Sequence, residues 1–405
     1  MAKGKVLIVG GGFAGVKAAL ELADDPHFSI TLLSDRDSFN YYPTLFHVAA
    51  GGRRANARIP LKNIFNGKPV NLQLGRAIQL DRQDKCIITA DKQRLPYDTL
   101  ILALGVVTNY FNIPGLESLS YGVKSIEQVE RFKQHLHRQL IEEKRPDLNY
   151  VIVGGGPTGI ELAGALPAYL KHLLRSHGLS DRSIHIDLVE AAPHLLPRLP
   201  RDASKLIRQR LRRLGIRLYL GQTVKGETAD SLIINNKQIQ SHTVIWTAGT
   251  RNHPFFSDNN FSLTYNHKVA TDVYLQAEDN IFVLGDNANT PFSGLAQTAI
   301  IDGHFVAKNL KRQACGKQFK SYRAKRPITI MPVGEGWAAV ISGNLRIYGW
   351  LGWVLRHLAD IWAFHDFEPW TQAGKQWATY FGEEENCPIC RKALGKPEKR
   401  TTVAE

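Results

Sequence analysis

The sequence has few cysteines and no long uncharged apolar run. Its cysteines are Cys86, Cys315, Cys387 and Cys390. Four scattered cysteines are too few for a disulfide scaffold, and the single C-x-x-C lacks the second pair that a structural metal site needs. The most apolar stretch is interrupted by Arg356 and Asp360, so no helix is expected to cross a bilayer. The chain begins Met-Ala-Lys-Gly-Lys and enters a strand-like run at once, which leaves no room for a signal peptide. We therefore expect a cytosolic protein that meets any membrane from its surface.

The composition is that of an ordinary globular protein with a strong positive charge. The 405 residues are 43% apolar and 22% charged, enough for two or three domains, and the formal net charge is +14. This excess favours nucleic acid, acidic lipid headgroups or phosphorylated cofactors as partners. A basic run at 201–217 has no interleaved aromatic residues and is typical of a solvated helix face, so we do not expect nucleic-acid binding.

The first residues carry a glycine-rich motif between a strand and a helix. A β-branched run at 6–9 is typical of a buried strand, Gly10, Gly12 and Gly15 form G-x-G-x-x-G, and a helical pattern follows. The first glycine permits a tight turn, the second lets a pyrophosphate approach, and the third lets helix and strand pack closely. The order of elements favours dinucleotide binding over a glycine-rich turn that binds nothing.

The same unit occurs again after residue 149. A strand at 150–153 leads into Gly154, Gly156 and Gly159, and a helical pattern continues to residue 174. Gly105 follows Gly10 by 95 positions, and Gly249 follows Gly154 by the same number. A repeat that matches in element order and spacing predicts two dinucleotide-binding domains.

A further buried strand at 280–284 lies outside the repeat and is expected to return to the first domain. The sequence thus predicts an α/β fold with two Rossmann-like domains, one inserted in the other, plus a C-terminal membrane-associating region. The expected boundaries are 1–115 with 270–325 for the first domain and 116–269 for the second. Residues 326–382 are expected to form the C-terminal amphipathic region, and 383–405 a disordered tail.

The C-terminal region contains two strand-like pieces, at 328–333 and 337–342, and then an amphipathic helical pattern at 346–364. One face of that helix would carry Ile347, Leu351, Val354, Leu358 and Ile361, widened by Trp350, Trp353 and Trp362. A tryptophan-rich amphipathic helix beside basic residues suits a membrane interface. Packing on the rest of the protein, or a dimer contact, would also account for the pattern.

With these residues in hand, the chain resembles the type II NADH:quinone oxidoreductases over about residues 3–382. The resemblance rests on Val-Gly-Gly-Gly-Phe-Ala-Gly at 9–15, Val-Gly-Gly-Gly-Pro-Thr-Gly-Ile-Glu at 153–161, Leu-Gly-Asp at 284–286 and Ala-Gln-Thr-Ala at 296–299. It implies FAD in the first domain and NADH in the second. The enzyme would pass hydride from NADH to FAD and two electrons to a quinone, without proton pumping, from the cytoplasmic face of the cell membrane.

Candidate site residues follow from the motifs and the resemblance. For FAD they are Gly10, Gly12, Phe13, Ala14, Gly15, Ser34, Asp35, Thr44, Gly105, Asp286, Ala296, Gln297 and Thr298. For NADH they are Gly154, Gly156, Thr158, Gly159, Glu161, Glu190 and Gly249. Glu161 and Gln297 are the expected catalytic residues, although Glu161 could simply be an acid favoured by the helix dipole.

Acidic residues at strand ends set the expected nucleotide contacts. Asp35 is the candidate for a ribose, with Ser34 as the alternative because the strand boundary is uncertain by a residue; a solvated turn aspartate is also possible. Asp286 can accept hydrogen bonds from a ribityl or ribose chain. Glu190 would bind the adenosine ribose and repel the 2′-phosphate of NADPH, which predicts a preference for NADH that Arg182 or His194 could weaken.

Two departures leave the electron acceptor open. Ile301 replaces the second glutamine of the family's Ala-Gln-x-Ala-x-Gln pattern, and the aromatic loop at 41–46 lacks the cysteine pair of flavin-dependent disulfide reductases. A disulfide or sulfide substrate is therefore disfavoured. A ferredoxin-like acceptor and a slowly turning NADH-binding sensor remain alternatives, as does a homodimer.

Overall fold

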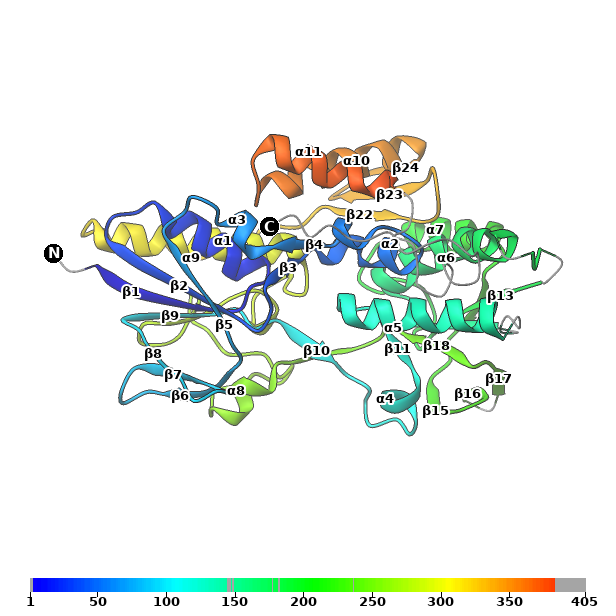
Figure 1. Cartoon of the computed structure of the whole chain (residues 1–405), viewed down its shortest axis with the longest axis horizontal. Helices are drawn as coiled ribbons and strands as arrows, with labels where there is room; N and C mark the ends of the chain where they lie inside the picture. Colours follow the sequence, from blue (N-terminus) through cyan, green and yellow to red (C-terminus); the bar gives the residue numbers. More distant parts are fainter. Residues whose placement is uncertain are drawn as a thin grey trace.

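The computed structural model describes residues 3–143, 147, 149–176, 178–180, 183–235 and 237–382. Two domains lie side by side, and the C-terminal segment forms a layer along one side of both (Figure 1). The predicted tail at 383–405, with Cys387 and Cys390, lies outside the described residues, as does Arg182.

The first domain is built on a six-stranded sheet in the order β20-β21-β9-β1-β2-β5. Its strands are β1 (Gly4–Val9), β2 (Phe28–Ser34), β5 (Val70–Leu74), β9 (Thr99–Leu102), β20 (Gln276–Glu278) and β21 (Ile281–Val283). All neighbours are parallel except β20 and β21. Because β21 pairs with β9 across the intervening second domain, the predicted return of this strand and the insertion of one domain into the other are confirmed.

Two helices pack together on this sheet, α1 (Phe13–Ala23) and α9 (Ala296–Ala314). A Cβ atom at Gly303 would lie 2.5 Å from the carbonyl oxygen of Ala14, so this glycine permits the close helix contact. Shorter elements complete the domain: β3 (Ser38–Asn40), η1 (Tyr42–Thr44), η2 (Arg54–Asn56), β4 (Arg58–Pro60), α3 (Leu61–Ile64), β6 (Ala77–Asp81), β7 (Cys86–Thr89), β8 (Arg94–Pro96), α8 (Pro254–Asp258) and η4 (Gly285–Asn287). The helix α2 (Leu45–Ala49) lies in the same stretch of the chain but packs into the core of the second domain.

The second domain has a five-stranded parallel sheet in the order β11-β18-β12-β13-β14. Its elements are β11 (Tyr121–Gly122), α5 (Ile126–His137), η3 (Arg138–Glu142), β12 (Asn149–Val153), α6 (Pro157–Ser176), β13 (His185–Glu190), α7 (Arg201–Arg213), β14 (Arg217–Leu220) and β18 (Thr243–Trp246). A small sheet of β15 (Val224–Thr228), β16 (Ser231–Ile234) and β17 (Lys237–Gln240) packs beside α4 (Leu116–Leu119). All five residues of β12 are buried, as expected for a central parallel strand.

The chain passes between the domains through a pair of short antiparallel strands, β10 (Val106–Thr108) and β19 (Thr250–Asn252). The sequence predicted the domain boundary a few residues later, at residue 115. Each strand follows directly after one of the repeated glycines, Gly105 and Gly249.

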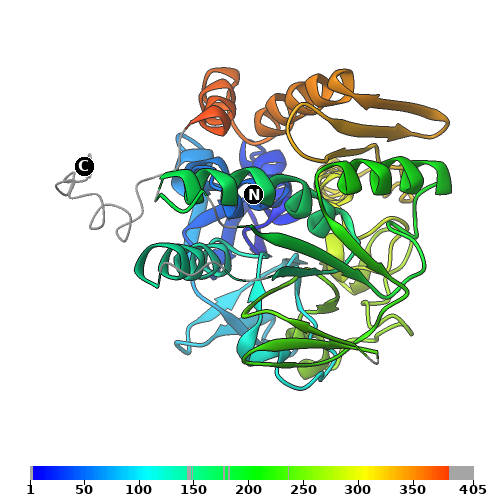
Figure 2. The ribbon, with the colours of Figure 1, turned by 90° about the vertical axis from the view of Figure 1, so that its right-hand side faces the viewer.

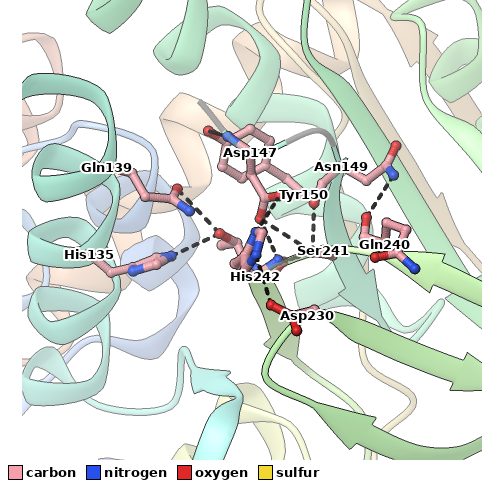
Figure 3. A network of polar contacts seen from close by, with 10 residues as sticks. His135, Gln139, Asp147, Asn149, Tyr150, Asp230, Gln240, Ser241 and His242 are labelled. Atoms are coloured by element: carbon pink, nitrogen blue, oxygen red, sulfur yellow. Dashed lines mark hydrogen bonds and ion pairs between the residues drawn. The ribbon is translucent and has the colours of Figure 1, made fainter. Parts of the chain in front are cut away.

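A polar network closes the amino-terminal edge of the second sheet (Figure 3). Asp147 is 4% exposed and accepts a hydrogen bond from the backbone N–H of His242 at 2.7 Å. Ser241 donates through Oγ to the carbonyl of Asn149 at 2.6 Å, with the Asp147 carboxylate at 3.5 Å. Although serine, histidine and aspartate meet here, the serine hydroxyl is directed to a carbonyl and not to the imidazole. The network therefore anchors β12 and β18 at the sheet edge opposite the carboxyl ends of the strands.

The C-terminal layer differs from the sequence prediction in one respect. It contains three antiparallel strands, β22 (Thr329–Pro332), β23 (Ala338–Ser342) and β24 (Leu345–Gly349), then α10 (Trp350–His365), α11 (Trp370–Ala378) and η5 (Thr379–Phe381). The prediction of a helix from residue 346 was wrong for its first four residues, which pair with β23; Ile347 is thus on a strand. Viewed from the side, this hairpin lies over the helices of the second domain (Figure 2).

Candidate functional site

The two glycine-rich loops have the same geometry. Cβ atoms at Gly15 and Gly159 would lie 2.0 and 1.9 Å from the carbonyl oxygens of Gly10 and Gly154, so no side chain is tolerated at either position. By contrast, a Cβ atom at Gly12 or at Gly156 would meet nothing within 4 Å. The first and third glycines thus make the turn and the helix contact, while the second faces open space where a phosphate can approach.

Backbone donors line both loops. In α1 the first intrahelical hydrogen bond runs from Val16 N to Gly12 O, so the N–H groups of Phe13, Ala14 and Gly15 precede it. The second loop repeats this arrangement, with a bond from Ile160 N to Gly156 O that leaves Thr158 in the first turn of α6. The Phe13 ring packs in the core against Phe39, so only its backbone is available to a ligand. Both helix starts therefore present free N–H groups and a positive dipole end to an anion.

The strand that follows each loop ends beside it, but with different chemistry. Glu190 accepts hydrogen bonds from Gly155 N at 2.5 Å and Ala192 N at 2.7 Å, which fixes its carboxylate at the loop. In the first domain the equivalent position is Ser34, whose Oγ would lie 2.5 Å from a Cβ atom at Gly11. Asp35 is 63% exposed and 4.0 Å from the Arg36 guanidinium. The structure thus brings Ser34, rather than Asp35, to the glycine loop.

The carboxyl edges of the two sheets meet around Gly105, Gly249 and Asp286. Gly105 and Gly249 have matching φ angles of +72° and +73°. Buried Asn287 accepts a bond from Gly105 N at 2.9 Å and donates to Gly105 O at 2.6 Å, and it donates to Asn252 of β19 at 2.7 Å. Asn287 therefore fixes the end of β9 to the interdomain strand pair. Sequence analysis missed it because an asparagine after a strand is a common turn residue.

Asp286 is held by the loop that precedes α9. Its Oδ1 accepts a bond from Gly294 N at 2.9 Å, and burial raises the pKa of its carboxyl. In the second turn of α9, buried Asp302 accepts bonds from Gly285 N at 3.0 Å and from the Tyr322 hydroxyl at 2.6 Å. Burial raises the pKa of Asp302 to about 6. Asp302 thus orients the Gly285–Asp286 turn by accepting the hydrogen bond from the Gly285 backbone N–H.

Lys124 is a second residue that sequence analysis missed. It lies between β11 and α5, and its Nζ donates to Gly249 O at 3.2 Å. Burial lowers the pKa of its ammonium group to about 8, and the nearby Asp286 carboxylate opposes that effect. A cation from the second domain is therefore placed near an acid of the first, where the two sheet edges meet. In the sequence it cannot be distinguished from a solvated loop lysine.

The start of α9 lies at the same crevice, beside the Gly285–Asp286 turn. The first intrahelical bond, from Ala299 N to Leu295 O, leaves the N–H groups of Ala296, Gln297 and Thr298 unpaired within the helix. The Thr298 hydroxyl donates to Phe292 O at 2.9 Å. Gln297 is exposed and its Oε1 accepts a bond from Ile328 N at 2.9 Å, which links it to the C-terminal layer.

Thr44 has a structural role in this arrangement. It is 1% exposed, and its hydroxyl donates to Tyr41 O at 3.2 Å and Asn56 O at 3.0 Å. These bonds fix the aromatic loop that sequence analysis associated with the first ligand. Cys86, the cysteine nearest to it in sequence, is buried in β7 of a separate small sheet.

Glu161 lies at the junction of the second domain and the C-terminal layer. It follows the first turn of α6, and burial raises the pKa of its carboxyl to about 8, an effect that nearby Arg356 opposes and Asp360 reinforces. Arg356 bonds to Asp360 and donates to Pro43 O at 3.0 Å, while the Tyr41 hydroxyl donates to Asp360 at 3.2 Å. At neutral pH Glu161 therefore carries a proton, next to a buried ion pair.

The inward face of α10 is the polar one. Gly352, Arg356, His357, Asp360 and Phe364 are its buried residues. Seven large apolar side chains of the layer are exposed and are together termed its apolar face: Leu345 (59%), Trp350 (71%), Leu351 (45%), Leu358 (57%), Trp362 (66%), Trp370 (51%) and Phe381 (56%). Among the described residues, no helix has both the length and the apolarity needed to span a membrane.

Comparison with known proteins agrees with this geometry. The family model for pyridine nucleotide-disulphide oxidoreductases matches residues 4–303. The chain belongs to this family. Among its relatives, the type II NADH:quinone oxidoreductase of Staphylococcus epidermidis is 24% identical over 82% of this chain and 87% of that protein. The corresponding enzyme of Mycobacterium tuberculosis is 26% identical over 89% and 85%.

Solved structures share the fold. NDH2 from Plasmodium falciparum, solved in complex with NADH, superposes with a TM-score of 0.85 at 19% identity and covers 98% of this chain and 99% of that one. The sulfide:quinone oxidoreductase of Aquifex aeolicus gives 0.76 at 18% identity, covering 96% and 98%. The predicted α/β fold with two Rossmann-like domains and the resemblance to type II NADH:quinone oxidoreductases are confirmed, as is the prediction of FAD and NADH as cofactors of this oxidoreductase.

Proposed function

We propose that this protein oxidises NADH and reduces a quinone through bound FAD, working at a membrane surface on the cytoplasmic side. The observation that carries the proposal is the meeting of the carboxyl edges of the two sheets at Gly105 and Gly249, with Glu161, whose pKa burial raises to about 8, at the junction with the C-terminal layer. The relatives named above are quinone reductases, which supports the choice of acceptor.

FAD, when bound, supplies the electron chemistry by accepting hydride and releasing two electrons. The chain supplies the rest. The loop at Gly12 and the first turn of α1 would hold its pyrophosphate, and Asp286 its ribityl chain. The N–H groups at the start of α9 would lie at the edge of its ring system, with Gln297 beside the acceptor. The second glycine loop and Glu190 would place NADH.

The C-terminal layer is proposed to hold the enzyme on the membrane. Seven large apolar side chains form its apolar face, and a basic helix, α7, contacts the layer through Arg210 and Asp202. A surface rich in tryptophan and bordered by arginine suits the interface of an anionic membrane. A homodimer would bury the same face, and sedimentation of the protein without lipid would show it.

The proposal is tested by anaerobic titration of the purified protein with NADH. A yellow protein should bleach, and short-chain ubiquinone or menaquinone analogues should then restore its colour. A protein that stays colourless when FAD is supplied would contradict FAD binding. One that bleaches but is reoxidised only by a ferredoxin-like protein would contradict the quinone assignment alone.

Replacing Glu190 with glutamine should shift the preference between nicotinamide cofactors. The substitution removes the negative charge next to the loop, so the 2′-phosphate of NADPH is no longer repelled, while the charged acceptor for the ribose hydroxyl is lost. We expect kcat/KM for NADH to fall about tenfold and that for NADPH to rise about tenfold. Glu117→Gln, an exposed change of equal charge, should alter neither; equal effects of both variants would contradict the assignment.

Replacing Lys124 with methionine should weaken FAD binding. The variant removes a buried cation from the crevice in which an anionic dinucleotide would lie, and about a tenfold rise in the dissociation constant is expected, measured by titrating apoprotein with FAD. Lys124→Arg should recover much of the affinity, and Lys225→Met, at an exposed lysine of β15, should have no effect. Unchanged affinity in Lys124→Met would exclude this role.

A further inference from the structure

A cavity of about 160 Å³ lies between α7 of the second domain and the β23–β24 hairpin of the C-terminal layer. Its lining residues are Leu206, Gln209, Arg210, Arg213, Trp337 and Tyr348. Its lining residues come from α7 and the hairpin, and none belongs to a glycine-rich loop or to the start of α9. No residue proposed above for FAD, NADH or the acceptor lines it.

The cavity has fixed walls. Arg210 donates through Nε to Val333 O and through Nη2 to Glu335 O, both at 3.1 Å. Arg346 of β24 forms an ion pair with Asp202 of α7 at 2.8 Å. These contacts hold the helix and the hairpin together, so the walls of the cavity are fixed by the packing of these two elements.

Its chemistry suits an anion joined to an apolar group. None of the six lining residues is acidic, and among the described residues Arg213 takes part in no ion pair. The Trp337 and Tyr348 rings stack with their centroids 6.0 Å apart. Within the same part of the chain, the Tyr348 hydroxyl is buried without a hydrogen-bond partner. Guanidinium and hydroxyl donors beside an aromatic wall match a phosphate ester whose remainder is apolar.

The cavity and the apolar face of the C-terminal layer share the β23–β24 hairpin. Tyr348 lines the cavity, whereas Leu345, three residues earlier in the same strand, is 59% exposed and points to the opposite face of the hairpin. An acyl chain that leaves the cavity would therefore pass around the edge of the hairpin to reach that face.

We propose that this cavity binds the phosphodiester of an anionic phospholipid, with the acyl chains along the apolar face. The inference deepens the proposed function, because it rests on the membrane association put forward above. It assigns to Arg213 and Tyr348 a specific contact with one headgroup, beyond the general attraction of a basic surface for an anionic membrane.

Binding of the FAD-loaded protein to vesicles tests the proposal. Vesicles of phosphatidylcholine alone are compared with vesicles that also contain phosphatidylglycerol. Arg213→Gln should weaken binding to the anionic vesicles about fivefold and leave binding to the neutral ones unchanged. Arg212→Gln is the matched control, since it removes the same charge from the same last turn of α7 without touching the cavity. It should weaken binding by less than about twofold.

Tyr348→Phe provides a test that leaves every charge in place. It should weaken binding to the anionic vesicles about twofold, because only the hydroxyl is lost. Equal losses in Arg212→Gln and Arg213→Gln would overturn the proposal in favour of diffuse attraction. Binding of inorganic phosphate by the wild type in calorimetry, with no preference for anionic vesicles, would overturn it in favour of a soluble phosphate ester.

Failure of this inference can be told apart from failure of the proposed function. Oxidation of NADH with a short-chain quinone in the absence of vesicles should be unchanged in all three variants. If the wild type bound neither kind of vesicle, membrane association itself would be contradicted. If it bound both equally well, only the headgroup contact would be excluded.

Discussion

Replacing Arg356 with methionine is expected to destabilise the protein by about 3–5 kcal/mol, because it leaves a buried carboxylate without its partner. The Arg356 and Asp360 side chains are 10% and 3% exposed, and the Tyr41 hydroxyl and Pro43 carbonyl complete their hydrogen bonds. Six of the seven tryptophans lie between residues 337 and 377, so urea unfolding followed by tryptophan fluorescence reports on this layer. The midpoint should move to clearly lower urea.

Two further variants test whether the loss of stability comes from breaking the buried ion pair. Arg346→Met breaks the ion pair with Asp202, whose side chain is 53% exposed, and should cost less than about 1 kcal/mol. The double variant Arg356→Met with Asp360→Leu removes both charges and should recover most of the stability, since an apolar pair can replace a buried ion pair. If the double variant were as unstable as Arg356→Met, lost packing rather than an unpaired charge would be the cause.

The nucleotide-binding units were predictable because their chemistry is local. A glycine at the third motif position is required by a carbonyl oxygen five residues earlier, 2.0 Å from where a side chain would begin at Gly15. Such constraints act within one turn, so the strand, loop and helix can be read from adjacent residues. The equal spacing from Gly10 to Gly105 and from Gly154 to Gly249 then identified the rest of the repeated domain.

The remaining site residues act across long separations, which a pattern in one segment cannot show. Asn287 bonds to Gly105, and Lys124 to Gly249; each is an ordinary loop residue until the fold brings the partners together. The helix at 350–365 illustrates the limit best. Its amphipathic pattern is visible in the sequence, but its polar side faces inward because Tyr41 and Pro43 supply partners more than three hundred positions away.

Replacing Glu161 with glutamine should slow reoxidation of the NADH-reduced enzyme by a quinone about a hundredfold, while reduction by NADH stays within about twofold of the wild-type rate. Quinone takes up protons as it is reduced, and a carboxyl whose pKa is raised to about 8 carries a proton at neutral pH. Glutamine keeps the shape and loses the proton. Stopped-flow measurement of the two half-reactions separates them.

The pH dependence of the quinone half-reaction tests the same proton-donating role. Below pH 8 the wild-type acid is protonated and can donate; as the pH rises through about 8 it ionises, so the quinone half-reaction should slow there, and Glu161→Gln should show no such step. Glu227→Gln is the matched control, because burial also raises the pKa of Glu227 to about 8, but it lies in β15, away from the crevice. Loss of the quinone rate in Glu227→Gln would mean that a buried acid matters for the fold, and loss of the NADH rate in Glu161→Gln would mean that Glu161 matters for hydride transfer. Either result would contradict a proton-donating role.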